Sequence, residues 1–140
     1  EAVVGGMTRL PPHPEVAGAL RRLRDGGRRL AALTNSTERV ARAQLAHAGI
    51  ADAFEAVLSA DAVRRLKPAP EPYRMAADRL GVDPPGVLLV AAHAWDVAGA
   101  LRAGCQAAFV ARPGKVLDPL ADPPELVVAD LDELADRLLA

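Results

Sequence analysis

Strand-like apolar runs and amphipathic helical segments alternate along this sequence, which limits the folds that it can adopt. Successive strand-like runs recur about every thirty residues, the length of a βαβ unit. We therefore expect an α/β, Rossmann-like fold in which helices cover both faces of a mostly parallel sheet. The expected strands are 28–33, 55–59, 87–92, 107–111 and 126–129, and the expected helices are 15–24, 37–47, 71–80, 95–103 and 131–139.

Length and charge narrow the classes of function. The sequence has 140 residues, which predicts a single domain, and its net charge of −1 gives no electrostatic reason to bind nucleic acid or an anionic membrane. No apolar run approaches the roughly 18 residues that cross a bilayer. We therefore expect a cytoplasmic protein whose partner is a small molecule.

Polar residues follow the expected strands where parallel strands end together, at one edge of the sheet. Thr34 and Asn35 follow the strand 28–33, Asp96 follows the strand 87–92, and Lys67 lies in the loop between them. Pro68 favours an extended backbone at Lys67, so the ammonium projects from a loop and can hold an anion. Each residue also has a simpler interpretation. Lys67 can be a solvated lysine, Thr34 and Asn35 ordinary helix capping, and Asp96 a first-turn carboxylate.

The order and spacing of these residues resemble the haloacid dehalogenase superfamily over 10–139. A hydroxyl residue, a lysine and an acidic residue follow one another there as Thr34, Lys67 and Asp96 do here. Within the superfamily the chain looks most like the 2-haloacid dehalogenase branch. Three sequences carry this likeness: Leu-Thr-Asn-Ser, Lys-Pro-Ala-Pro-Glu-Pro-Tyr and Ala-His-Ala-Trp-Asp-Val-Ala-Gly-Ala.

The resemblance implies chemistry without a metal or a cofactor. Phosphatase members of the superfamily hold magnesium with a second carboxylate, and Ala92 occupies that place here. A hard cation would therefore lose an oxygen ligand.

The resemblance also makes Thr34, Lys67 and Asp96 candidate catalytic residues, and it implies roles for several side chains of the site. Lys67 would pair with a nucleophilic aspartate, Asn35 would help cradle the departing halide, and Asp96 would orient or activate the hydrolytic water. Tyr73 would support the site near the substrate carboxylate, and Trp95 would contribute to substrate binding.

His93 stands where the branch often has asparagine. Because an imidazole donates or accepts a hydrogen bond near neutral pH, His93 is a candidate catalytic residue. The alternative is a partly buried histidine at the start of a helix. The branch also often has serine where this chain has Ala91, so hydrogen bonding around the water can differ.

Two parts of the superfamily pattern are missing from the sequence. No Asp precedes Asp25, so the first strand that carries the nucleophile in Asp-x-Asp or Asp-x-x-Gly-Thr is expected to be absent, as is the cap domain. Without that strand its two neighbours would lie about 9.6 Å apart, with unpaired edges. We expect residues 1–140 to be the C-terminal part of a core domain, a truncated piece of a longer parent. A homodimer or a complementing N-terminal segment would be other ways to close the gap.

The expected function of the parent is hydrolysis of short 2-haloalkanoic acids to 2-hydroxy acids through an aspartyl ester. The substrate would be a halogenated carboxylate, and this chain alone would be inactive. Two alternatives stay open: a magnesium-dependent phosphatase of the same superfamily, and a non-catalytic binding or assembly module.

Overall fold

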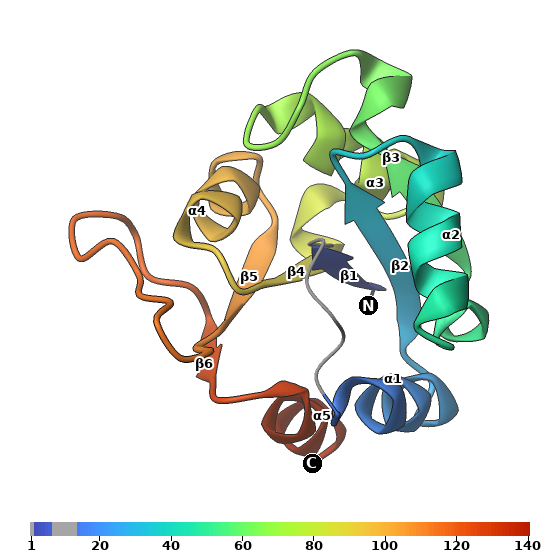
Figure 1. The fold of residues 1–140 in the computed structure, drawn as a ribbon. Helices are drawn as coiled ribbons and strands as arrows, with labels where there is room; N and C mark the ends of the chain where they lie inside the picture. Colours follow the sequence, from blue (N-terminus) through green and yellow to red (C-terminus); the bar gives the residue numbers. More distant parts are fainter. Residues whose placement is uncertain (1, 7–13) are drawn as a thin grey trace.

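The computed structural model of the protein describes residues 2–6 and 14–140 (Figure 1). Within these residues, six parallel strands form one sheet in the order β3-β2-β1-β4-β5-β6. The strands are β1 Ala2–Gly6, β2 Arg29–Thr34, β3 Ala56–Ser59, β4 Val87–Ala91, β5 Gln106–Val110 and β6 Leu126–Val128. The α/β class and the parallel sheet expected from the sequence are confirmed.

The helices cover both faces of the sheet. They are α1 Val16–Asp25, α2 Glu38–His47, α3 Pro70–Leu80, α4 Ala94–Arg102 and α5 Leu131–Leu139. One apolar core contains Leu23 of α1, Leu45 of α2 and Leu134 of α5, and a second contains Tyr73 of α3 and Val97 of α4. Each expected helix agrees with an observed helix to within one residue at either end, because the 3.6-residue apolar period and the glycines after the helices mark both limits.

The expectation that a strand would be missing from the middle of the sheet is wrong. β1 lies between β2 and β4 and pairs with both, with Val3 opposite Leu30 and Leu88. Val3 and Val4 are 5% and 0% exposed, so both faces of the strand are buried. Pairing on two sides satisfies the backbone groups that an open gap would leave unpaired.

The second half of that expectation concerned the nucleophile. Ala2–Gly6 contains no acidic residue and ends in Gly5 and Gly6. The central strand is therefore present without a carboxylate at its end.

No helix within residues 2–6 and 14–140 combines the length and the apolar character that a membrane crossing requires.

Candidate active site

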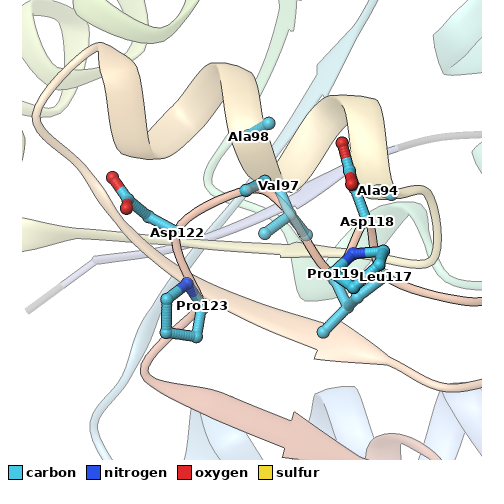
Figure 2. A pocket seen from close by; sticks show the side chains of 9 residues that line it. Ala94, Val97, Ala98, Leu117, Asp118, Pro119, Asp122 and Pro123 are labelled. Carbon is cyan, nitrogen blue, oxygen red and sulfur yellow. The ribbon is translucent and has the colours of Figure 1, made fainter.

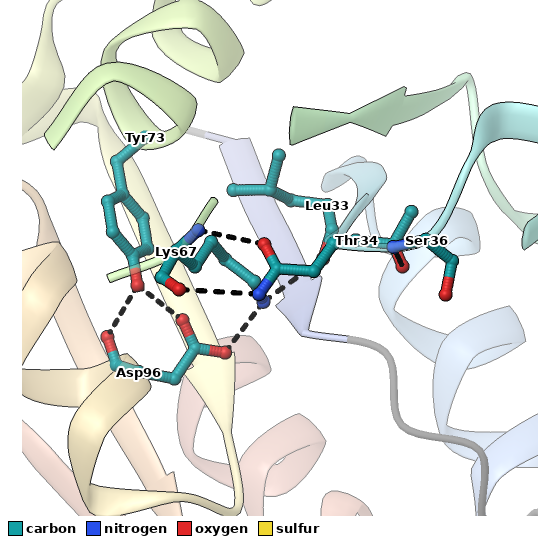
Figure 3. A network of polar contacts seen from close by, with 7 residues as sticks. Leu33, Thr34, Ser36, Lys67, Tyr73 and Asp96 are labelled. Atoms are coloured by element: carbon teal, nitrogen blue, oxygen red, sulfur yellow. Dashed lines mark hydrogen bonds and ion pairs between the residues drawn. The ribbon is translucent and has the colours of Figure 1, made fainter. Parts of the chain in front are cut away.

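Lys67 is buried at the edge of the sheet where the strands end (Figure 3). Its side chain is 2% exposed, and Nζ donates to Oδ2 of Asp96 at 2.8 Å and to the carbonyl oxygen of Leu33 at 3.3 Å. The interpretation of Lys67 as a solvated lysine is therefore wrong. Burial of an ammonium is unfavourable unless a charged partner and further hydrogen bonds compensate, and Asp96 and Leu33 supply both.

Asp96 lies in the first turn of α4 and accepts hydrogen bonds from two buried donors, Lys67 and Tyr73. Oδ1 accepts a hydrogen bond of 2.6 Å from the Tyr73 hydroxyl, which also lies 3.2 Å from the Asp96 carbonyl oxygen. Burial, and then the negative charge of Asp96, raise the pKa of Tyr73 far above its ordinary value. Tyr73 therefore remains a neutral donor, and the Asp96 carboxylate is fixed between an ammonium and a phenol.

Asn35 holds the backbone of Lys67. Its Oδ1 accepts from the Lys67 N–H at 2.8 Å, and its Nδ2 donates to the Lys67 carbonyl oxygen at 3.3 Å. The amide thereby fixes the loop that carries the buried ammonium. One N–H of Nδ2 remains for another acceptor.

Thr34 shapes the turn after β2. It is 1% exposed, and its Oγ1 accepts from the Ser36 N–H at 3.0 Å. Ser59, at the end of β3, donates to the Ser36 carbonyl oxygen at 2.6 Å and thereby joins the neighbouring strand end to this turn. The capping of α2 comes from Thr37, which accepts from the Val40 N–H. Thr34 and Asn35 are therefore free of the capping role.

His93 and Trp95 lie beside the Lys67–Asp96 pair. The Lys67 Nζ is 5.7 Å from the centroid of the Trp95 ring, and the His93 ring is likewise 5.7 Å from that of Trp95. Trp95 is 45% exposed, which leaves part of the indole accessible from solvent. His93 is partly buried and its Nε2 is 3.3 Å from Nζ of Lys115. Burial, and then the Lys115 ammonium, lower the pKa of His93.

Lys115 was not predicted from the sequence. It lies 22 positions after His93 in the loop that follows β5, so only the fold brings the two together. A Pro-Gly pair directly before Lys115 indicates a turn there, yet nothing in the sequence says where that turn points.

Two surface pockets lie apart from this group of residues. One lies between α4 and residues 117–123 (Figure 2). Apolar side chains line most of it, and the carboxylates of Asp118 and Asp122 line the rest. The other lies beside β3 and includes Met75 and Arg79 of α3. Lys67, Tyr73 and Asp96 line neither, so the site is recognised by its buried polar contacts.

Comparisons with known proteins agree with the family that the motifs resemble. A family model described as haloacid dehalogenase-like hydrolase matches residues 1–104. Haloacetate dehalogenase H-2 of Moraxella sp. (strain B) is 36% identical over 126 residues, 90% of this chain and 56% of that protein. The structure of L-2-haloacid dehalogenase from Xanthobacter autotrophicus with chloropropionic acid covalently bound is similar with a TM-score of 0.87 at 31% identity. That similarity covers 93% of this chain and 62% of the other.

A phosphatase is also among the relatives. Phosphoglycolate phosphatase of Neisseria meningitidis is 37% identical over 94 residues, 67% of this chain and 40% of that protein. The chain spans about half the length of the curated relatives that it matches.

Proposed function

We propose a function for this chain, which belongs to the haloacid dehalogenase-like hydrolase family. It supplies the residues that support the nucleophile in a site that hydrolyses short 2-haloalkanoic acids. A carboxylate outside this sequence would displace the halide from carbon 2 and form an ester. Water would then attack the ester carbonyl carbon, releasing the 2-hydroxy acid and regenerating the carboxylate. Relatives named (S)-2-haloacid dehalogenase support this choice of substrate class.

The observation that carries the proposal is the buried contact of Lys67, Asp96 and Tyr73. In the proposed reaction Lys67 pairs with the attacking carboxylate, and its ammonium also stabilises negative charge in a site with little water. Asp96 orients the water through lone pairs that Lys67 and Tyr73 leave unused, since each carboxylate oxygen can accept more than one hydrogen bond. Tyr73 supports the site near the substrate carboxylate, and Trp95 offers the partly exposed indole as a contact for the substrate.

The remaining residues have narrower proposed roles. Asn35 contributes its free N–H to the departing halide while it holds the Lys67 backbone. Thr34 keeps the turn after β2 in place. His93 acts as a hydrogen-bonding group near the Lys67–Asp96 pair, since its ring lies beside Trp95 and the Lys67 ammonium lies over the same indole.

The test uses chloride release from 2-chloropropionate. We expect none from the purified 140-residue chain, because no Asp precedes Asp25 and β1 carries no acid. We expect turnover from a polypeptide in which an upstream strand with Asp-x-Asp or Asp-x-x-Gly-Thr precedes this chain and takes the place of β1 between β2 and β4. Turnover should be lost in its Lys67→Met and Asp96→Asn variants. Chloride release by the chain alone would refute the missing-nucleophile part of the proposal.

A magnesium-dependent phosphatase is the second candidate, favoured by the phosphatase among the relatives. The residues present do not fit a magnesium ion. Among Lys67, Tyr73 and Asp96, only Asp96 has a carboxylate, and Lys67 and Tyr73 each donate a hydrogen bond to one of its oxygens. The side chain of Ala92 has no oxygen that could serve as a further ligand. Magnesium-dependent phosphate release by the longer polypeptide would nevertheless decide for the phosphatase.

The broader assignments are proposals of the same kind. Residues 1–140 would be the C-terminal part of a core domain in a cytoplasmic enzyme, completed by an N-terminal segment or by a second copy of the chain. A non-catalytic binding or assembly module is the alternative. The DNA sequence upstream of the codon for Glu1 separates them, since an open reading frame with an acid-bearing strand favours the enzyme.

A further inference from the structure

A tight turn places Lys115 over the start of α4. The Lys115 N–H donates to the Arg112 carbonyl oxygen at 2.9 Å, and Gly114 has a φ of 79°, which glycine adopts without strain. Arg112 in turn makes two hydrogen bonds of 2.8 Å to the carboxylate of Glu15, and both side chains are largely buried. The loop is therefore anchored to the residue before α1, and the position of Lys115 follows from that anchor.

The contact between Lys115 and His93 fixes the ring proton. An ammonium has three N–H donors and no acceptor, so at 3.3 Å the Nε2 of His93 must accept. The proton of the neutral ring then lies on Nδ1. A protonated His93 would present a second positive N–H to the ammonium, and that arrangement is repulsive.

No carboxylate forms an ion pair with Lys115 in the part of the chain that the structure describes. The groups that act on His93 are Lys115 from the loop after β5, Asp96 from α4 and Lys67 from the loop before α3. Lys67 is already neutralised by Asp96. The charge of Lys115 is therefore left to act on the imidazole.

The use of lysine here differs from the rest of the chain. Of the 17 basic residues 15 are arginines. The two lysines both contact the segment that begins α4: Lys67 contacts Asp96, and Lys115 contacts His93. A lysine ammonium is a compact point charge that can direct one N–H at one lone pair, whereas a guanidinium presents a planar fork. At both positions the ammonium directs separate N–H groups at individual acceptor atoms.

We propose that Lys115 is a positioning residue that holds His93 as a neutral imidazole with the proton on Nδ1, beside the Lys67–Asp96 pair. This inference rests on the proposed function in one respect. In that reaction His93 serves as a fixed N–H donor to the water or the substrate carboxylate, and Lys115 occupies the nitrogen that a general base would need.

The test is nitrogen-15 NMR of the histidine rings in the 140-residue chain, with His93 assigned by a His93→Gln variant. In the original chain, without substitutions, we expect His93 to carry its proton on Nδ1 and to have a pKa below the ordinary value for histidine. In Lys115→Met we expect the pKa to rise, since the neighbouring cation is gone, and both tautomers to be populated. Lys115→Arg restores the positive charge and should lower the pKa again.

The matched control is Arg42→Met. It also removes one cation, but Arg42 is exposed and pairs with Glu38 on α2, so His93 should titrate as in the original chain. Trp95, the single tryptophan, gives a second reading of the same titration through its fluorescence. Unfolding curves of each variant show whether the fold is kept.

An unchanged His93 titration in Lys115→Met, or a dominant Nε2–H tautomer in the original chain, would overturn the inference. None of these readings needs turnover. Failure of the dehalogenation assay therefore leaves this result standing, and an unchanged titration leaves the dehalogenase proposal standing.

Discussion

At the scale of single residues, the site depends on how a buried ammonium and a buried carboxylate compensate each other. The side chains of Lys67 and Asp96 are 2% and 4% exposed, so each has lost almost all of its hydration. Their attraction, together with the hydrogen bonds from Tyr73 and to Leu33, offsets that loss. Such a pair contributes little net stability, but either partner alone is strongly unfavourable.

A double-mutant cycle tests this balance. Asp96→Asn should lower the free energy of unfolding by about 3–5 kcal/mol, because it leaves the Lys67 charge buried without a partner. Lys67→Met should be similarly destabilising, while the double variant should lose clearly less than the sum of the two. Urea unfolding at pH 7 gives all three values. Additive losses would show that the two charges do not compensate each other.

The raised pKa of Tyr73 predicts that the free energy of unfolding falls at alkaline pH. Its folded pKa lies far above the unfolded value of about 10, so above pH 10 the unfolded chain loses the phenolic proton while the folded chain keeps it. The free energy of unfolding should then fall by about 1.4 kcal/mol per pH unit from this group. Burial also raises the pKa of Cys105 to about 11. This thiol therefore adds a further decrease in the free energy of unfolding, which begins near pH 9.

The measurement combines urea unfolding between pH 7 and pH 11 with absorbance at 295 nm. Tyr73 is the single tyrosine, so tyrosinate absorbance reports it directly. No tyrosinate should form before the chain unfolds. Tyr73→Phe should show a shallower decrease above pH 10, and tyrosinate in the folded chain at pH 10 would contradict the prediction.

Sequence reasoning brought Lys67, Asp96 and Thr34 together because the ends of parallel strands meet at one edge of a sheet. It did not find what each side chain would contact there. The pairing of Lys67 with Asp96 and the two hydrogen bonds from Asn35 to the Lys67 backbone require atoms to be placed to within about an ångström, and local sequence pattern carries no such information. Lys115 was missed because its position depends on an anchor at Glu15, far away in the sequence.

At the scale of elements, α4 packs against the Lys67–Pro68 segment and α3 through a glycine. A Cβ on Gly99 would lie 2.7 Å from Cβ of Pro68, 2.7 Å from the Tyr73 hydroxyl and 2.9 Å from the Pro68 carbonyl oxygen. Backbone and a buried hydroxyl surround this position, so little can move. The absence of a side chain at Gly99 thus allows Tyr73 to reach Asp96.

Gly99→Ala and Gly18→Ala should therefore have opposite effects. Alanine favours a helix over glycine by about 1 kcal/mol, and at Gly18, on the exposed face of α1, a Cβ meets nothing within 4 Å. Gly18→Ala should raise the free energy of unfolding. Gly99→Ala should lower it by about 1–3 kcal/mol through overpacking, despite the better helix propensity. Thermal or urea unfolding gives both signs, and stabilisation by Gly99→Ala would contradict the packing argument.

At the scale of the whole molecule, the sequence predicted the elements on either side of β1 but not β1 itself. Helical periods and apolar runs are local, so α1 to α5 and β2 to β6 could be read from them. Ala2–Gly6 is short and ends in two glycines, which weaken a strand. It becomes a strand because β2 and β4 pair with it on both sides, and that is a property of the assembled sheet.

Deleting residues 1–6 should therefore disrupt the whole sheet. β2 and β4 would be left about 9.6 Å apart, two strand spacings, and each buried backbone group left without a partner costs about 1–3 kcal/mol. We expect the shortened chain to bind a hydrophobic dye, to associate with itself and to lose cooperative unfolding. A synthetic peptide Glu-Ala-Val-Val-Gly-Gly should restore cooperative unfolding. The same peptide with aspartate at both valines should fail, because Val3 and Val4 are buried. If the shortened chain unfolds cooperatively at the original urea midpoint, β1 does not hold the sheet together and the centre of the molecule must be stabilised in another way.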